Sequence, residues 1–424
     1  MSVLALLLLL LSVSAQHPQP PTPLLSPVSK DNITGFFALQ IYLKTPLHPL
    51  KLHLDLGSYL PWLDCLKHYS SSSSYRPLPT DSTLCLHLDT KVSGNCFRPP
   101  APGCFNNSCM FFPENFITRK IGLGDVFIDD FAPGKGGPVS DVVFSCTAVP
   151  SDTVVANVFK GLARGSHGVA ALGRFSYSLP AQVSRSFSSP EIFAVCLPSV
   201  VKGSGGFVLF NAPGPYRFSG VGNVSLVYTP LILGPVGVET QIFFWYTSPD
   251  YYIGVSAIKI NGVNIALNRT LLAVDSNGNG GTRLSSSTRY TTLQSSIFSA
   301  VVAAFVEESA KFNLTSVPAV APFPACFSAK GLSVGKTGPV VPGVDLVLQA
   351  ANVLWRIDGS NSMVYVGGRW CLGLGDGGVN ARTSIVIGAF QLEDHLLQFD
   401  LESQRLGFSS SLLTYGTACH AFHV

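Results

Sequence analysis

The most constraining feature of the sequence is a degenerate repeat that places one short pattern in each half of the chain. In the first half, the turn Asp55-Leu56-Gly57-Ser58 ends an apolar run and is followed by the apolar segment 168–173. In the second half, segment 285–288 reads Ser-Ser-Ser-Thr and is followed by the apolar segment 384–388. Both apolar segments end at a glycine, which lets two backbones approach closely. The repeat therefore predicts two lobes related by approximate symmetry.

The pattern between these segments indicates an all-β protein with a few short helices. Short alternating or apolar runs, such as 37–43 and 51–56, are separated by clusters of Pro, Gly and Ser, which is typical of strands. The best helical periodicity is in segment 294–312, where Ile297, Val301 and Phe305 recur at four-residue steps. A length of 424 residues suits two domains of ordinary size, each able to bury its own core.

The N-terminus has the pattern of a secretory signal. Residues 4–11 are apolar and are followed by the small residues 13–15, so a signal peptide is predicted over 1–15. The apolar run is too short to span a bilayer, and no other membrane span is predicted. Residues 16–30, rich in Pro, Ser and Gln, are expected to form a flexible leader. The two lobes are then expected over 31–220 and 221–424, with Pro and Gly residues near 212–228 interrupting the strands at the boundary.

Cysteines and asparagines agree with export. The chain has ten cysteines, an even number, and none is spaced as a C-x-x-C metal site, which favours an oxidised framework. Five triplets of the form Asn-x-Ser/Thr predict a glycosylated surface; they begin at Asn32, Asn106, Asn223, Asn268 and Asn313.

Charge and histidine content exclude several classes of function. The formal charge is only +3 and no Lys/Arg cluster occurs, so no nucleic-acid partner is expected. The nine histidines form neither an H-E-x-x-H motif nor a cluster, so neither a metal nor any other cofactor is predicted.

Several stretches, in this order, resemble one known family, and the match spans nearly the whole mature chain. The family is that of the pepsin-like aspartic proteases. Within it, the chain is similar to a plant branch of secreted proteins that contains xylanase inhibitors, extracellular dermal glycoprotein, basic 7S globulin and xyloglucanase inhibitors. The resemblance implies a bilobal, all-β pepsin-like fold. The matching stretches are residues 54–65, 102–109, 178–182, 280–285 and 391–400.

The same resemblance implies that the catalytic apparatus is vestigial. Active members carry Asp-Thr/Ser-Gly at both turns, and two Asp side chains share one proton across a water. Here the two positions are Asp55 and Ser285, and a serine does not ionise in the required range. Leu56 replaces the hydroxyl that would orient Asp55, and segment 111–115 replaces a Gly-rich flap with its tyrosine. Because positioned acid/base groups are each worth roughly 10²–10⁴ in rate, little turnover is expected. The simplest role for Asp55 is then to cap its own turn.

Disulfide pairing does not follow from spacing alone. The resemblance implies three pairs: Cys65 with Cys146, Cys196 with Cys419, and Cys326 with Cys371. The remaining four cysteines are then expected to pair among themselves, in an order left open; they are Cys85, Cys96, Cys104 and Cys109.

The resemblance further implies a binding function in the extracellular space or cell wall. Relatives inhibit microbial glycoside hydrolases that attack the plant wall, a role in defence, so a hydrolase is the expected protein partner. Their contact residues correspond here to Gln391 and to the loop before Cys419, which offers Tyr415 but no His or Arg. Two alternatives remain: an active aspartic endopeptidase, for which Asp275 is the acid nearest to Ser285, and a storage or peptide-binding protein of the 7S globulin type.

Overall fold

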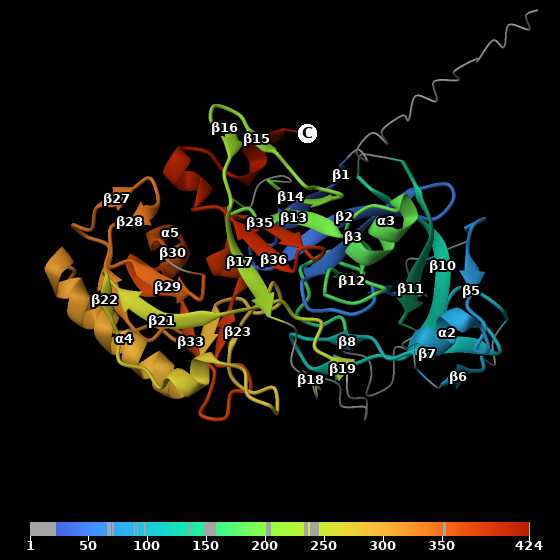
Figure 1. The fold of residues 1–424 in the computed structure, drawn as a ribbon, viewed down its shortest axis with the longest axis horizontal. Coiled ribbons are helices and arrows are strands. Elements are labelled where there is room, and N and C mark those ends of the chain that lie inside the picture. The colour runs from blue at the N-terminus through green and yellow to red at the C-terminus, as the bar shows by residue number, and fades with distance from the viewer. Residues whose placement is uncertain are drawn as a thin grey trace, which may run out of the picture.

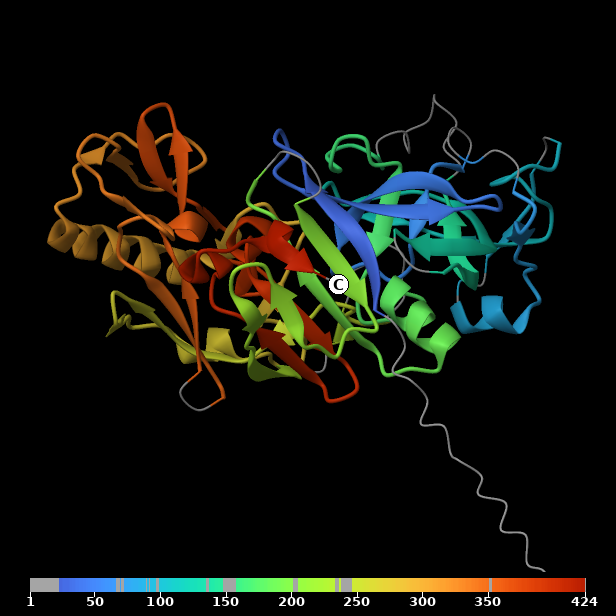
Figure 2. The same ribbon diagram turned by 90° about the horizontal axis from the view of Figure 1, so that it is seen from above.

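The protein is described by a computed structural model with 37 numbered strands and a few short helices (Figures 1 and 2). The described residues are 23–65, 69, 72–88, 90, 92–96, 99–134, 137–147, 158–200, 205–232, 236–237, 246–350 and 353–423. The predicted signal peptide lies outside them. No helix in these ranges is long and apolar enough to cross a membrane.

A six-stranded antiparallel sheet forms the centre of the molecule and contains strands from both ends of the chain. In Figure 1 its green and red strands lie side by side between the two halves. In spatial order the strands are β1 (Leu24–Lys30), β14 (Gly206–Phe210), β13 (Ile192–Cys196), β35 (Leu396–Asp400), β36 (Arg405–Phe408) and β17 (Val227–Ile232).

Strand β1 corrects the expectation of a flexible leader over residues 16–30 for residues 24–30, while residues 16–22 lie outside the described residues. Residues 24–30 pair with β14 on one side and with the next strand along the chain on the other. Leu24, Ser26 and Val28 are buried while the residues between them are partly exposed, which is the alternation of a strand with one covered face. The Pro and Ser content obscured this period in the sequence.

In its described residues, the first half of the molecule consists of strands and two helices. Its remaining strands are β2 (Phe37–Leu43), β3 (His48–Asp55), β4 (Trp62–Leu63), β5 (Arg76–Pro77), β6 (Ser93–Gly94), β7 (Ser108–Phe111), β8 (Glu114–Asn115), β9 (Lys120–Ile121), β10 (Gly124–Pro133), β11 (Val139–Cys146) and β12 (Gly168–Ala171). Its helices are α2 (Thr83–Leu88) and α3 (Leu179–Phe187).

The second half repeats this mixture and adds the longest helix. Its remaining strands are β15 (Tyr216–Phe218), β16 (Gly222–Val224), β18 (Val236–Gly237), β19 (Tyr246–Thr247), β20 (Tyr252–Ile253), β21 (Val255–Ile260), β22 (Val263–Asn264), β23 (Thr282–Leu284), β24 (Thr291–Leu293), β25 (Ser316–Val317), β26 (Cys326–Ser328), β27 (Val334–Gly335), β28 (Gly338–Pro339), β29 (Val344–Leu348), β30 (Leu354–Ile357), β31 (Met363–Val366), β32 (Arg369–Leu372), β33 (Leu374–Asp376), β34 (Ile385–Ile387) and β37 (Phe422–His423). Its helices are α4 (Ser295–Ser309), α5 (Gly359–Ser362) and the 3₁₀ turns η1 (Arg269–Leu272), η2 (Ala310–Phe312), η3 (Ala389–Leu392), η4 (Leu412–Tyr415) and η5 (Cys419–Ala421).

The helical prediction for segment 294–312 is confirmed by α4 and η2. Ile297, Val301 and Phe305 are all buried, so the apolar stripe read from the sequence is the face that packs on the sheet. Gln294 caps the helix by accepting a hydrogen bond from the Ser296 N–H at 2.9 Å, which satisfies one of the otherwise unpaired first amides.

The internal repeat has the geometry that the sequence indicates. In the first half, β12 runs parallel to β3, and Ala171 lies opposite Asp55. In the second half, β34 runs parallel to β23, and Ile387 lies opposite Leu284. A Cβ at Gly173 would lie 2.5 Å from the carbonyl oxygen of Ser58, and a Cβ at Gly388 would lie 2.4 Å from the Tyr290 carbonyl carbon. Both glycines are therefore required by a close backbone approach.

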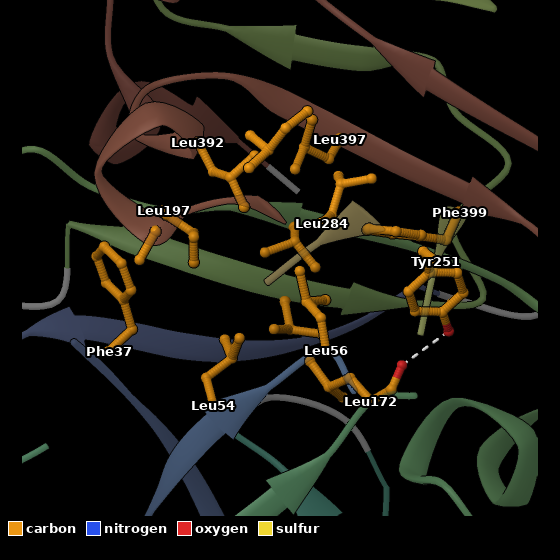
Figure 3. Packing of buried hydrophobic residues seen from close by; sticks show 14 of the residues in the cluster. Phe37, Leu54, Leu56, Leu172, Leu197, Tyr251, Leu284, Leu392, Leu397 and Phe399 are labelled. Carbon is orange, nitrogen blue, oxygen red and sulfur yellow. Dashed lines mark hydrogen bonds between the residues drawn. The ribbon is translucent and has the colours of Figure 1, made fainter. Parts of the chain in front are cut away.

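The core is continuous across the junction between the halves. Figure 3 shows side chains of β2 and β3, together with Leu56 and Leu172, packing against side chains of β23 and β35. Phe193 stacks on Phe399 with ring centroids 4.7 Å apart, and the Tyr251 hydroxyl donates to the Leu172 carbonyl at 2.8 Å. This shared apolar core holds the two turns at residues 55–58 and 285–288 in a fixed relation.

All ten cysteines are paired in the structure. Three disulfides are those that the resemblance implied, and the other two resolve the open set as Cys85–Cys109 and Cys96–Cys104. At the five predicted glycosylation triplets the asparagine is exposed in every case; these residues are Asn32, Asn106, Asn223, Asn268 and Asn313. Covalent attachment of sugars at these positions remains a prediction.

Candidate functional site

The first candidate residue, Asp55, ends β3 and is 3 % exposed. Its carboxyl accepts hydrogen bonds from the Gly57 N–H and the Ser58 hydroxyl, both at 2.8 Å. Burial raises the pKa of Asp55, and these two hydrogen bonds act in the opposite direction by favouring the ionised form. Asp55 thus caps its own turn, as the simplest interpretation of the sequence expects.

Ser285 follows β23 and faces the same small hollow as Asp55. Its backbone N–H donates to the Ile387 carbonyl at 2.9 Å, which fixes the turn against β34. The hollow measures only about 30 Å³. Since one water needs roughly 10–15 Å³ of such space, the hollow has room for about one or two waters. It is lined by Asp55, Gly57, Phe116, Arg119, Asp250, Arg283, Ser285, Ser287 and Thr288.

A second carboxyl group does enter this hollow, but the sequence prediction missed it. Asp250 lies close to Gly57, on the side of the glycine that faces Asp55. A Cβ built on Gly57 would be 2.5 Å from Asp250 Oδ1 and 3.6 Å from Asp55 Oδ1. Asp250 is 3 % exposed and forms an ion pair with Arg283 at 2.8 Å, and it also accepts a hydrogen bond from the Ser248 hydroxyl at 2.9 Å. Because the guanidinium already compensates this carboxylate, Asp250 does not reproduce a pair of acids sharing one proton.

The acid considered from the sequence, Asp275, does not reach the site. It holds its own loop by accepting hydrogen bonds from the amides of Asn277 and Asn279, both at 2.8 Å. These bonds, chiefly those from Asn279, lower the pKa of Asp275.

The two turns are joined by one serine. Ser286 accepts a hydrogen bond from the Leu56 N–H at 3.0 Å and donates one to the Leu54 carbonyl at 2.9 Å. The equivalent position in the first turn is Leu56, whose apolar side chain is buried in the shared core. The cross-connection between the turns therefore runs through a side chain of the second turn.

His53 and Ser287 form a second connection that the sequence did not predict. His53 Nδ1 accepts from the Ala163 N–H at 3.2 Å, so the ring proton is on Nε2, which donates to the Ser287 hydroxyl at 3.0 Å. Complete burial lowers the pKa of His53 to about 3, so the ring stays neutral. A hydrogen bond from Ser287 in turn favours the ionised form of Asp55. Because His53 donates to Ser287, it does not act as the base of a serine nucleophile.

A hairpin covers the hollow, although the sequence predicts that the Gly-rich flap of active proteases is missing here. Strands β8 and β9 pair with each other, and Phe116 and Arg119 of the connecting turn line the hollow. The Arg119 guanidinium forms an ion pair with the Glu114 carboxylate at 3.3 Å. Glu114 is buried, which disfavours its charged form. Burial raises the pKa of Glu114 to about 7, and the negative charge of Asp55 acts in the same direction. The segment that stands in place of the flap therefore still forms a hairpin over the hollow, but with different side chains.

Of the two predicted contact residues, Gln391 is buried and Tyr415 is exposed, so the structure corrects the prediction for Gln391. Gln391 lies on η3 and is fully buried. Its amide oxygen accepts from the Thr291 N–H at 2.7 Å, and its NH₂ group donates to the carbonyls of Asn361 and Gly373, both at 2.9 Å. Gln391 is thus a structural residue that joins three segments. Tyr415, on η4, is 44 % exposed and accessible to a partner.

These geometries define what the site can do chemically. The hollow brings together Asp55, Asp250 paired with Arg283, Arg119 and several hydroxyls within a small volume. Within the described ranges, no group of three or more His, Cys, Asp or Glu side chains is arranged to hold a metal ion.

Comparison with solved structures places this geometry on a known fold. The crystal structure of edgp superposes with a TM-score of 0.88 at 41 % identity and covers 95 % of this chain and 98 % of that one. The soybean basic 7S globulin structure superposes with a TM-score of 0.78 at 32 % identity, covering 95 % and 99 %. An aspartic proteinase from Irpex lacteus has a TM-score of 0.59 at 13 % identity, which shows the pepsin-like fold alone.

Sequence comparison gives the same result. A protein named Probable aspartic proteinase GIP2, from Nicotiana benthamiana, is 43 % identical, over 99 % of this chain and 97 % of its own length. The family models for the N-terminal and C-terminal parts of xylanase inhibitors match residues 37–210 and 250–410. The chain therefore belongs to the xylanase-inhibitor-type family of pepsin-like proteins.

Proposed function

We propose that this protein is a secreted, non-proteolytic member of its family that binds and inhibits a microbial cell-wall-degrading glycoside hydrolase, either a xylanase or a xyloglucan endoglucanase, in plant defence. The observation that carries the proposal is the site itself: Ser285 occupies the second acidic position, and the extra acid Asp250 is ion-paired with Arg283. A pepsin-like scaffold that lacks a proton-sharing pair is suited to binding. The apolar N-terminal segment and the five disulfides support the extracellular location.

The scaffold offers a rigid platform for such a contact. Tyr415 projects from η4, whose Leu412 N–H donates to the Asp394 carbonyl at 2.8 Å. The disulfide between Cys419 and Cys196 anchors the chain four residues later. A fixed loop loses little conformational entropy on binding, which favours tight insertion into the open cleft of a hydrolase. An interface of standard size, roughly 1,600 Å² in total, suffices.

The test is a titration of the purified protein into a panel of fungal xylanases and xyloglucan endoglucanases. We expect stoichiometric loss of activity for at least one enzyme. The Tyr415→Ala variant is expected to weaken inhibition about tenfold or more, because exposed tyrosines at interface centres often contribute over 1.4 kcal/mol. Tyr365→Ala, at an exposed tyrosine of β31, serves as the matched control. If no enzyme in the panel loses activity or binds, inhibition is refuted.

A second candidate function is an aspartic endopeptidase. Asp55 and Asp250 line one hollow, and a relative carries the name Probable aspartic proteinase. Casein digestion at acidic pH, with pepstatin as the inhibitor control, distinguishes the two functions. Cleavage that pepstatin blocks and that Asp55→Asn abolishes would establish the peptidase.

A third candidate is storage or peptide binding, supported by the similarity to a soybean protein named Basic 7S globulin, which is 32 % identical. High abundance in seed together with capture of a peptide, and without binding to any hydrolase, would favour this function over inhibition.

A further inference from the structure

The hairpin of β8 and β9 is a small element that covers the hollow at Asp55 (β8 in Figure 1). Its strands have two residues each, and Phe116 and Arg119 of its turn line the hollow. Arg119 has a φ of 55°, in the left-handed region that costs free energy for a residue with a Cβ. Neither the sequence nor the proposed function gives this hairpin a role of its own.

Asn115 fastens the hairpin to the segment that precedes β12. It is fully buried, and its NH₂ group donates to the carbonyls of Val158 at 2.6 Å and Lys160 at 2.9 Å. Its side-chain oxygen accepts from the amides of Ile117 and Thr118, at 2.9 and 3.2 Å, and so shapes the turn. These hydrogen bonds join neutral groups that do not titrate, so this fastening does not depend on pH.

Glu114, the residue before Asn115, carries the carboxyl group of the hairpin and is 7 % exposed. One of its oxygens lies 3.3 Å from the Arg119 guanidinium, and the other is buried with no hydrogen-bond partner among the described residues. The Arg119 side chain is half exposed, so water screens the attraction that it offers. An ionised Glu114 would therefore keep one oxygen buried and uncompensated, which is a costly arrangement.

The charged groups on the surrounding elements do not favour an ionised Glu114. Asp55, at the end of β3, repels it, and Asp250 and Arg283 compensate each other at 2.8 Å. The other charged side chains on the hairpin and on its fastening segment are exposed; they are Lys120 and Lys160. Burial raises the pKa of Glu114 to about 7, with Arg119 acting against this shift and Asp55 in its favour. The covered carboxyl group is therefore neutral in acid and ionises around neutral pH.

We propose that protonation of Glu114 controls this hairpin, which is closed over the hollow in acid and opens toward neutral pH, bringing the carboxylate into water and uncovering Asp55 and Ser285. Opening breaks the hydrogen bonds of Asn115 and moves Phe116 away from the hollow, while the rest of the fold stays intact. The site therefore has a covered form in acid and an uncovered form at neutral pH. The device does not depend on hydrolase binding, so it is measurable on the protein alone.

The experiment measures hydrogen–deuterium exchange of the full disulfide-bonded protein between pH 5 and pH 8. Each rate is divided by the intrinsic rate of an unstructured peptide at the same pH, and peptides spanning the hairpin are read by mass spectrometry. The reporting amides include those of Arg119 and Gly122, which donate to the carbonyls of Asn115 and Pro113, both at 2.7 Å. Peptides from the paired central strands β13 and β35 report global unfolding and are the internal reference.

Four variants separate the causes of opening. Glu114→Gln keeps the shape of the side chain and removes its titration. Asn115→Ala removes the fastening that does not depend on pH. Asp55→Asn removes the neighbouring negative charge. Glu307→Gln, at an exposed residue of α4, is the control.

We expect the open population of the hairpin to rise about seventyfold from pH 5 to pH 8, because the carboxyl pKa is 4.5 when exposed and about 7 when covered. Glu114→Gln should stay at the acid level throughout. Asn115→Ala should increase opening by a similar factor at both pH values. Asp55→Asn should reduce the rise and end it at lower pH, and Glu307→Gln should match the parent.

The proposal is overturned if the hairpin exchanges only together with the central strands, or if its opening is independent of pH. It is equally overturned if the rise persists in Glu114→Gln; loss of the rise in Asp55→Asn alone would then assign the titration to Asp55. The pH profile of the parent and its shift in Asp55→Asn test the proposal even if Glu114→Gln does not fold.

Discussion

The turn at Asp55 and the turn at Ser285 occupy equivalent places in the two halves, yet they carry different groups. The first turn has a carboxylate at position 55 and an apolar side chain at position 56. The second has a serine at position 285 and the hydroxyl of Ser286, which hydrogen-bonds to both Leu54 and Leu56. The difference shows that the chemical and the structural functions of these turns are separable.

The polar contacts around the two turns also differ. Asp55 accepts local hydrogen bonds from Gly57 and Ser58, and a further one comes from Ser287 of the second turn. Around Ser285, Ser287 reaches across the junction to His53, whereas Arg283 pairs with Asp250 of its own half. The hydrogen bonds that join the two halves at this place are thus made by side chains of the second turn, and the first turn receives them.

The largest expected effect tests the ion pair beside the second turn. Arg283→Met leaves the carboxylate of Asp250 buried without its counter-ion, close to Asp55. We expect this change to lower the free energy of unfolding by about 3–5 kcal/mol, as for other broken buried pairs. Urea denaturation measures it. The double variant Arg283→Met with Asp250→Leu should recover most of the loss, and a single variant as stable as the parent would show that Arg283 is not required.

The glycines behind the two turns give a direct test of their equivalence. Gly173→Ala and Gly388→Ala each place a Cβ within 2.5 Å of backbone atoms, so a strand must shift. We expect each to lower the free energy of unfolding by about 3 kcal/mol, the upper part of the usual range for overpacking. Gly335→Ala, where the new Cβ would lie 3.8 Å from the Gly338 carbonyl oxygen, is the control. Unequal losses at 173 and 388 would break the symmetry between the halves.

The serine that joins the turns is expected to have a smaller effect. Ser286→Ala removes both hydrogen bonds to the first turn and leaves the Leu54 carbonyl and the Leu56 N–H buried without a partner. The expected loss of stability is about 2 kcal/mol, measured by thermal or urea unfolding. Ser286→Thr retains the hydroxyl and should lose less. Equal losses for the two variants would indicate packing, rather than hydrogen bonding, as the cause.

The smallest effect concerns the hairpin over the first turn and depends on pH. The folded pKa of Glu114 is raised from 4.5 to about 7, so between these values the folded protein keeps a proton that the unfolded chain has released. Stability therefore falls as the pH rises through this window. Glu114→Gln removes the dependence, and we expect a gain of about 1–2 kcal/mol at pH 7.5 and little change at pH 4. Glu307→Gln, at an exposed residue of α4, should show neither effect, and a loss at pH 7.5 in Glu114→Gln would contradict the assignment.

Much of the fold could be predicted because local patterns determine it. The repeat identified β12 and β34 through their terminal glycines, and four-residue periodicity identified α4. The leader was misjudged at β1 because Pro27 and three polar residues obscured an alternation that only pairing with β14 and β2 completes. The fold follows from patterns of short range, whereas a terminal strand acquires its structure from distant partners.

The sequence predicted the two turns of the site but not the residues that surround them. Asp250, His53 and Glu114 have no motif, because their roles depend on neighbours distant in sequence. One signal was present: Arg283 stands in an apolar strand directly before Ser285, and a cation in such a place requires an acid nearby. Gln391 was assigned to an interface because its neighbours resemble a contact segment, whereas its four hydrogen-bonding positions are all used internally.

The disulfide between Cys196 on β13 and Cys419 on η5 spans 223 positions of the chain and closes almost the whole second half into one covalent ring. A single proteolytic cut anywhere inside that ring would open the backbone without releasing a fragment. The nicked protein would run as one band on a non-reducing gel and as two after reduction. The covalent ring therefore keeps both halves attached even where the backbone is broken.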